Sequence, residues 1–301
     1  MRHVEALLPF LPALLLEAFC YFFSLFPKLE KAFGRWPLLT KSLALTASGA
    51  LPVYGLQLAA GGGWSHQFTT LCFALLVVCC WPLLLPQKPW ADIGLLVLLT
   101  GLILSDYFLL LYPETASGLK LKALAKLLWM RVGIQTFAYV RKFSVPRMGF
   151  LPNGQEWGIG LLHFGLVLAV LVPVGWWTGA LKWQLPNVET WQLPFLAAGY
   201  FCALMLFLAY GEEYLVRGVL QQSLAKWMGG RVLPLLVTSL CFGAIHLPFR
   251  GQFPNWRFAL VAAVAGVFYG TAFWQANSLR AAMVTHALTV TAWTMLFARS
   301  I

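Results

Sequence analysis

Nine stretches of this chain are apolar over lengths close to that of a helix that crosses a lipid bilayer. A helix rises by about 1.5 Å per residue, so about 20 mostly apolar residues span the hydrocarbon core. The stretches are 5–26, 43–60, 67–86, 92–112, 157–178, 193–224, 232–247, 257–275 and 279–298. Because Gly49 and Pro52 interrupt the second stretch and the seventh is short, we expect eight or nine spans. The pattern predicts an all-α fold, a polytopic transmembrane helical bundle.

The scarcity of charge supports a membrane environment. Charged residues make up 10% and hydrophobic residues 60% of the chain, whereas soluble domains carry roughly a quarter charged residues. We therefore expect an integral, multi-pass protein of a bacterial inner (cytoplasmic) membrane, with the lipid bilayer as its surroundings. Basic loops beside anionic headgroups explain the net charge of +11, so we expect no nucleic-acid partner.

A basic segment, residues 116–150, divides the chain. Within it, LKLKALAKLLWMRVGIQTFAYVRKF interleaves leucines and aromatics with Lys120, Lys122, Lys126, Arg131, Arg141 and Lys142. So many charges are atypical of a spanning helix and typical of an amphipathic helix that lies at the membrane interface. We expect an N-terminal transmembrane bundle over 1–115, then this interfacial segment, then a C-terminal bundle over 151–301.

The C-terminal bundle carries ionisable residues inside its apolar runs, which is costly and by default indicates function. In GEEYLVRG, Glu213 and Arg217 are four residues apart with the acid first, so they share a helix face and can pair. Glu212 is rotated by about 100° from Glu213 and lacks that partner. An unpaired buried carboxylate is expensive, which makes Glu212 the candidate general base. The pair itself could be a structural network that joins helices.

Two histidines follow on later apolar runs. In LCFGAIHLPF, Phe242 and His246 are four residues apart on one helix face, close to the helix end that Pro248 favours. In MVTHALTVTAW, His286 lies within the last run. A lone histidine in such a run is more often a satisfied core residue. Carboxylate and imidazole groups that converge from neighbouring helices, however, are typical of a hydrolytic site.

Two chemistries fit this cluster. In one, Glu212 takes a proton from a water that His246 helps to hold, and His286 donates to the oxyanion as the scissile carbonyl becomes tetrahedral. In the other, the same groups bind Zn²⁺, which lowers the pKa of the water. The H-E-x-x-H signature of zinc proteases is absent from the sequence. We therefore favour the version without a cofactor and keep zinc as the alternative.

Taken together, the three motifs resemble the CPBP family of intramembrane proteases, which are described as metalloproteases or glutamate proteases. The family includes the type II CAAX prenyl proteases and Abi-like bacterial proteins. The resemblance covers residues about 190–298. It implies an all-helical membrane endopeptidase in which Glu212 and His246 activate a water and His286 stabilises the oxyanion. Glu213, Arg217 and Phe242 are then supporting residues.

One position departs from the family pattern. The family has Asn or Asp four residues after the last histidine, where this chain has Val290. Loss of one oxyanion donor can cost roughly 10²–10³ in rate. The resemblance implies hydrolysis of a membrane-associated peptide or protein, either of the CAAX type or a precursor peptide. The departure leaves open a catalytically weak or inactive membrane scaffold or immunity-type protein.

Three further candidates among the ionisable residues of the apolar runs lie outside these motifs. Glu17 and Asp106, in the N-terminal bundle, are expected to make interhelical or helix-end hydrogen bonds. His163, near the start of its run, is expected at the membrane interface. A transporter that uses buried carboxylates as a proton relay is a further alternative, but the sequence shows no inverted repeat.

Overall fold

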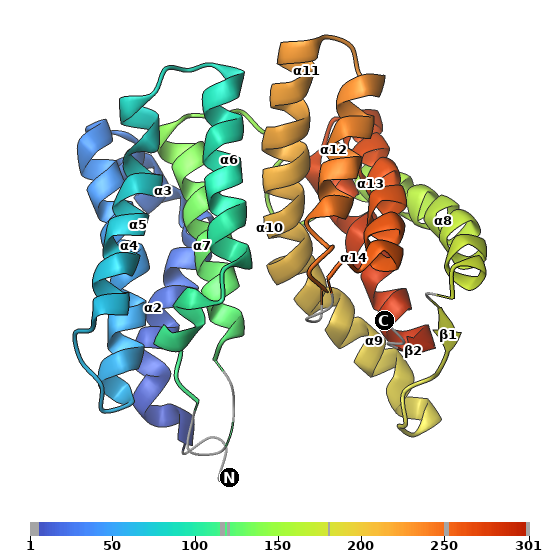
Figure 1. The fold of residues 1–301 in the computed structure, drawn as a ribbon, viewed down its shortest axis with the longest axis horizontal. Coiled ribbons are helices and arrows are strands. Elements are labelled where there is room, and N and C mark those ends of the chain that lie inside the picture. The colour runs from blue at the N-terminus through green and yellow to red at the C-terminus, as the bar shows by residue number, and fades with distance from the viewer. Residues whose placement is uncertain (1–5, 115–117, 119–120, 180, 250–252, 299–301) are drawn as a thin grey trace. The chain divides into compact units, whose positions relative to one another are not determined.

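The computed structural model of this chain describes residues 6–114, 118, 121–179, 181–249 and 253–298. These residues fall into two compact units, Met1–Phe143 and Ser144–Ile301. Figure 1 colours the first unit from blue to green and the second from green to red. Most of the described residues are helical, and the two strands contain two residues each. The predicted all-α class is therefore confirmed.

The first unit is a bundle of helices of unequal length. Its α-helices are α2 (Leu11–Tyr21), α3 (Pro27–Gly34), α4 (Leu38–Ala59), α5 (His66–Leu84), α6 (Pro89–Leu104) and α7 (Ala123–Gln135). Short 3-10 helices cover Leu8–Phe10, Phe23–Leu25 and Tyr107–Leu111, and a π-helix covers Thr136–Val140. Helix α5 begins where the Ser65 side chain accepts a hydrogen bond from the Phe68 amide.

Two buried ion pairs lie inside the first unit. The guanidinium of Arg131 binds both carboxylate oxygens of Glu17, at 2.7 Å and 2.9 Å, and also contacts Ser48 and Gln135. Such a two-point contact is among the stronger hydrogen-bonded ion pairs. It joins α2 to α7 and confirms the interhelical contact expected for Glu17. The second pair, Arg141 with Asp92, joins the end of the π-helix to α6.

The structure differs from the sequence prediction at these two arginines. The division between the units follows Phe143, so most of the segment 116–150 belongs to the first unit. Arg131 and Arg141 are buried there, whereas Lys122 and Lys126 are exposed, and Lys120 lies outside the described residues. The charges predicted an interfacial amphipathic helix, because the acidic partners of the two arginines are far away in the sequence and gave no local signal. Whether the exposed lysines contact headgroups stays a prediction.

The described part of the second unit contains one long, bent helix made of consecutive α and π segments, and four further α-helices. Its elements are α8 (Gly154–Trp177), β1 (Lys182–Trp183), α9 (Leu193–Ala203), α10 (Tyr210–Glu213), α11 (Gln222–Met228), α12 (Val232–Ala244), α13 (Trp256–Ala276), α14 (Leu279–Leu296) and β2 (Phe297–Ala298). Two π-helices, Leu204–Ala209 and Tyr214–Gln221, connect α9, α10 and α11. The strands pair antiparallel and connect the segment between α8 and α9 to the end of α14.

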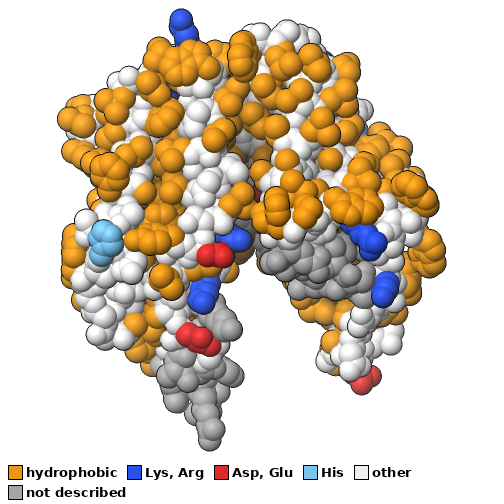
Figure 2. All heavy atoms as spheres, viewed as in Figure 1, with side chains coloured by type: hydrophobic (Ala, Val, Ile, Leu, Met, Phe, Trp, Pro, Cys, Tyr) orange, Lys and Arg blue, Asp and Glu red, His pale blue; other side chains and the backbone are white. Residues whose placement is uncertain are grey.

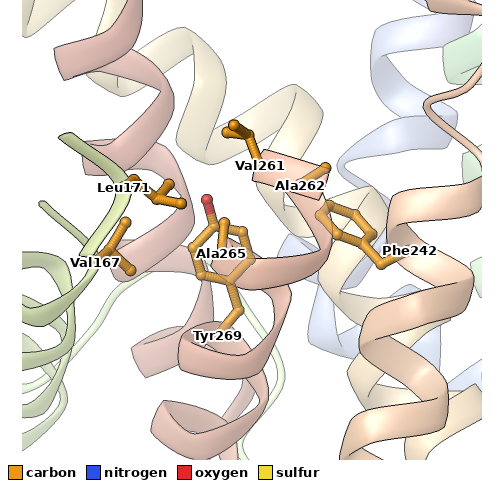
Figure 3. Packing of buried hydrophobic residues seen from close by; sticks show 7 residues of the cluster. All are labelled: Val167, Leu171, Phe242, Val261, Ala262, Ala265 and Tyr269. Atoms are coloured by element: carbon orange, nitrogen blue, oxygen red, sulfur yellow. The ribbon is translucent and has the colours of Figure 1, made fainter. Parts of the chain in front are cut away.

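Helix α13 packs against α8, α12 and α14. A cluster of buried side chains fills the space between these helices: Val167, Leu171, Phe242, Val261, Ala262, Ala265 and Tyr269 (Figure 3). Gly243 allows α12 to approach α13 closely, because a Cβ there would lie 2.5 Å from the carbonyl oxygen of Ala259. Small residues at helix contacts are typical of membrane bundles, where backbones must approach to pack well.

Four described helical stretches are long and apolar enough to cross a membrane: His66–Leu84, Gly154–Trp177, Thr190–Met228 and Trp256–Ala276. Large apolar side chains such as Phe73, Val97 and Leu240 are exposed. Figure 2 shows hydrophobic side chains over much of the visible face. Such a surface fits lipid contact. The other predicted runs are also helical, and the total of eight or nine spans stays a prediction.

His163 is buried within α8, and its Nδ1 lies 3.0 Å from the carbonyl oxygen of Ile159. The backbone carbonyl one turn earlier thus supplies a partner for this side chain. Its location at the membrane interface stays a prediction. Asp106 immediately precedes the 3-10 helix Tyr107–Leu111 and is exposed, as a helix-end residue.

Candidate active site

Glu212 and Glu213 lie in an unusual part of the long helical path. They end α10, which has only four residues and lies between the π-helices Leu204–Ala209 and Tyr214–Gln221. A π-helix widens the turn and is frequent at functional sites, since its geometry is otherwise unfavourable. The unusual backbone therefore occurs at the same two residues, Glu212 and Glu213, that stand out in the sequence as acids within an apolar run.

Glu213 is fully buried, and both of its carboxylate oxygens have a partner. Arg217 Nε donates to Oε2 at 3.1 Å, so the pair predicted from the four-residue spacing is present. The other oxygen, Oε1, lies 2.8 Å from His286 Nδ1. A carboxylate oxygen can only accept, so Nδ1 carries the hydrogen in this contact. Glu213 therefore joins α14 to the long helix and fixes the orientation of the His286 ring.

Arg217 is held on its other sides as well. Its guanidinium carbon lies 5.3 Å from the centre of the Phe242 ring, a cation–π distance. Its Nη1 donates to Gln221 Oε1 at 3.4 Å, and Gln221 in turn donates to the carbonyl oxygen of Gly270. The arginine thus belongs to a buried polar network that reaches α12 and α13. This arrangement fits a supporting role better than direct contact with a substrate.

Glu212 has different surroundings from Glu213. Its side chain is 16% exposed, and its Oε2 lies 3.9 Å from His286 Nε2. This distance is too long for a direct hydrogen bond. A water molecule could bridge the two groups at such a separation. His286 therefore presents one nitrogen to the buried carboxylate of Glu213 and the other toward the more accessible carboxylate of Glu212.

His246 lies just beyond the end of α12 and is partly exposed. Its Nδ1 lies 2.7 Å from the carbonyl oxygen of Phe242. Because a carbonyl can only accept, Nδ1 carries the hydrogen and Nε2 is left as an acceptor. A ring held in this form can hold a water through Nε2. The predicted Phe242–His246 spacing thus gives a direct contact between the two residues.

Aromatic rings hold both histidines in place. Phe242 meets the His246 ring edge to face at 4.8 Å and the His286 ring at 5.9 Å. Tyr269 stacks on the other histidine, His286, with ring centres 4.6 Å apart and planes 15° apart. The sequence reasoning did not identify Tyr269. It is one tyrosine in an apolar helix with no motif around it, so no local signal could have found it.

A cavity of about 230 Å³ opens beside these rings. His246, His286 and Val290 line it, together with apolar residues that include Leu171, Phe249, Phe258, Val261 and Trp293. Within the described part of the chain, the lining does not include Glu212, which approaches the cluster through His286. The site therefore combines a mostly apolar cavity with two imidazoles at its wall, an arrangement typical of a binding site for an apolar ligand.

Among the described residues, no group of three or more His, Cys, Asp or Glu side chains lies close enough together to hold a metal ion. Nδ1 of His286 and Nδ1 of His246 already have acceptors, so only the Nε2 atoms of these rings have the lone pair that a metal requires.

Part of the chain is similar to a known protein family. Residues 193–292 match the family described as type II CAAX prenyl endopeptidase Rce1-like. The match covers about a third of the chain, from the start of α9 into α14. It contains all the motif residues and confirms the resemblance found in the sequence. No curated protein and no solved structure matches the chain.

Proposed function

We propose that the second unit is a membrane endopeptidase of the CAAX prenyl protease type that uses a glutamate-activated water. The observation that carries the proposal is the position of His286 between two carboxylates, bound to Glu213 at 2.8 Å and separated from Glu212 by 3.9 Å. This arrangement lies inside the segment that matches the endopeptidase family. It also gives the two adjacent glutamates different tasks.

The proposed reaction begins with a water between Glu212 and His246. Glu212 takes a proton from the water while the Nε2 lone pair of His246 holds its other hydrogen. The water oxygen bonds to the carbonyl carbon of the scissile peptide. His286, when doubly protonated, donates from Nε2 to the oxyanion that forms. The carbon–nitrogen bond then breaks, and the leaving amine takes the proton that Glu212 acquired.

Glu213 and Arg217 support this reaction without touching the substrate. Glu213 holds Nδ1 of His286, so that Nε2 is the atom directed toward the reacting groups. Arg217 neutralises the buried carboxylate of Glu213, which would otherwise be costly to bury. Removal of Glu213 should therefore disturb both the fold and the orientation of His286.

The apolar cavity indicates the substrate class. Its wall is mostly aliphatic and aromatic, and both imidazoles face it. An apolar group close to the scissile bond would fill it, such as the prenyl group of a CAAX-type cysteine or the apolar side chains of a precursor peptide. Integral membrane location, in a bacterial inner membrane, belongs to the same proposal because such substrates are membrane-associated.

The test uses the purified full-length protein in liposomes and a quenched fluorescent peptide. The peptide carries a farnesylated cysteine followed by three residues, and a matched peptide carries the free cysteine. We expect cleavage of the farnesylated peptide after the cysteine, located by mass spectrometry, and loss of cleavage in Glu212→Gln. Wild-type cleavage by the Glu212→Gln variant would contradict the mechanism. Cleavage of both peptides at equal rates would favour precursor-peptide processing.

A membrane scaffold or immunity-type protein is the second candidate function. Val290 favours it, because this apolar residue faces the cavity where the family pattern expects a polar donor. In that case the charged residues would form only a structural network. A wild-type protein that cleaves neither peptide, and whose biological effect survives Glu212→Gln, would support this candidate.

A further inference from the structure

The proposed reaction lacks a second hydrogen-bond donor for the oxyanion, because Val290 cannot supply one. An oxyanion in acyl transfer is usually stabilised by more than one hydrogen-bond donor. His286 supplies one donor in the proposed function, on which this inference rests. Val290 lines the cavity and has no polar atom in its side chain. A second donor must therefore come from another residue at the cavity wall.

The hydroxyl groups next to Val290 are already engaged. Thr289 Oγ1 donates to the carbonyl oxygen of Thr285 at 2.7 Å. Thr291 Oγ1 donates to the carbonyl oxygen of Ala287, also at 2.7 Å. A threonine hydroxyl has one hydrogen, so neither can donate to an oxyanion without giving up a bond within α14. The oxygen of Thr289 can still accept a hydrogen bond.

Tyr269 is another hydroxyl-bearing residue at the cavity wall. It lines the cavity from α13, is only 2% exposed, and stacks on the His286 ring. Stacking on the histidine fixes the phenol relative to the other oxyanion donor. Figure 3 shows its hydroxyl directed toward the side of Leu171 and Val261, which belong to the apolar cavity wall.

We propose that the Tyr269 hydroxyl is the second oxyanion donor, and that it replaces the polar side chain absent at Val290. When a substrate carbonyl enters the cavity, its oxygen accepts the phenolic hydrogen of Tyr269. The hydrogen bond strengthens as negative charge develops on that oxygen, so the contact lowers the barrier more than it tightens substrate binding.

The test compares kinetic constants of purified variants in liposomes with the farnesylated quenched peptide. Tyr269→Phe keeps the ring that stacks on His286 and removes only the hydroxyl. We expect kcat to fall by ~10²–10³ with KM changed by less than about threefold. Tyr139→Phe, which removes a tyrosine hydroxyl bonded to Glu30 in the first unit, is the matched control and should retain wild-type kcat.

A second variant separates donation from packing. Adding Val290→Asn to Tyr269→Phe places a donor where the family pattern has one, and should restore most of the lost kcat. Retention of wild-type kcat by Tyr269→Phe would overturn the inference, and so would a loss that Val290→Asn does not reduce. Failure of the proposed function looks different, because Glu212→Gln would then cleave as well as wild type or the wild-type protein would not cleave at all.

Discussion

Nδ1 of His286 lies 2.8 Å from Oε1 of Glu213, a contact between residues 73 positions apart. It connects the last helix of the second unit to the short helical turn that carries both glutamates. The adjacent carboxylate of Glu212 approaches the other nitrogen of the same ring. One imidazole thus lies between the buried carboxylate of Glu213 and the partly exposed carboxylate of Glu212, and the variants below test the different roles proposed for them.

Replacement by glutamine should lower the unfolding temperature at Glu213 but hardly change it at Glu212. Glu213→Gln removes the charge that compensates Arg217, and both residues are fully buried. Breaking such a pair costs ~3–5 kcal/mol, so the unfolding temperature of the purified protein in detergent should fall markedly. Glu212→Gln should unfold close to the wild-type temperature, because its carboxylate is partly exposed and makes no contact as short as those of Glu213. Equal destabilisation by both substitutions would contradict the assignment.

Removing both members of the buried pair gives a sharper test. Glu213→Leu alone leaves the Arg217 charge uncompensated in the core, whereas Glu213→Leu with Arg217→Met leaves no buried charge. We expect the double variant to unfold at a higher temperature than Glu213→Leu, yet to remain inactive because His286 has lost its orienting partner. A double variant as unstable as Glu213→Leu would show that the pair is not the source of the cost.

A side chain at Gly243 should destabilise the packing of α12 against α13. Gly243→Ala would place Cβ 2.5 Å from a backbone oxygen of Ala259, so the helices must separate. Overpacking of this kind costs ~1–3 kcal/mol, and it should also displace His246 and lower activity. Gly199→Ala is the control, since its Cβ would meet no described atom within 4 Å. Thermal unfolding of the two variants should therefore differ clearly.

Arg131, one of the buried arginines of the first unit, can be compared with an exposed lysine of the same helix. Arg131→Met removes the two-point contact with Glu17 and leaves that acid without its partner, so the expected cost is ~3–5 kcal/mol. Lys126→Met changes an exposed residue of the same helix and should be nearly neutral. Similar small effects for both substitutions would favour the interfacial helix that the sequence pattern suggested.

The proposed reaction uses no metal ion. Peptide cleavage by the liposome-reconstituted protein should therefore persist after dialysis against EDTA and treatment with 1,10-phenanthroline. Metal analysis of the active protein should find less than one equivalent of zinc. Loss of cleavage with chelator, followed by recovery with added Zn²⁺, would contradict the metal-free mechanism and support the zinc alternative.

The sequence predicted the features that depend on local spacing. Apolar runs of about 20 residues predicted the helices, because burial in lipid requires a continuous apolar surface. The four-residue spacing predicted the pair of Glu213 with Arg217 and the contact of Phe242 with His246. The family match over 193–292 confirms the resemblance that these motifs carry. The catalytic roles of Glu212, His246 and His286 remain predictions.

Features that depend on distant partners could not be predicted. The number of charges around Arg131 predicted an interfacial amphipathic helix, and its partner Glu17, 114 positions away, gave no local signal. The contact of His286 with Glu213 gave no local signal either. Tyr269 gave no signal because stacking on a histidine follows from how α13 packs on α14, which local sequence does not encode. A charge in an apolar run therefore indicates that a partner exists, but only the fold shows which one.

The two π-helices on either side of Glu212 and Glu213 determine which deletions the long helix can accept. Each π segment contains one wide turn, so removing a single residue from it would restore ordinary α-helical geometry without breaking the chain. Because the wide turn accommodates the extra residue, the helix on either side of the deletion would keep its orientation. The first segment, Leu204–Ala209, should therefore accept a one-residue deletion. The second segment contains Arg217 and Gln221, whose contacts with Glu213 and with each other depend on their present spacing. Shortening within the second π segment is therefore the change that should abolish the site.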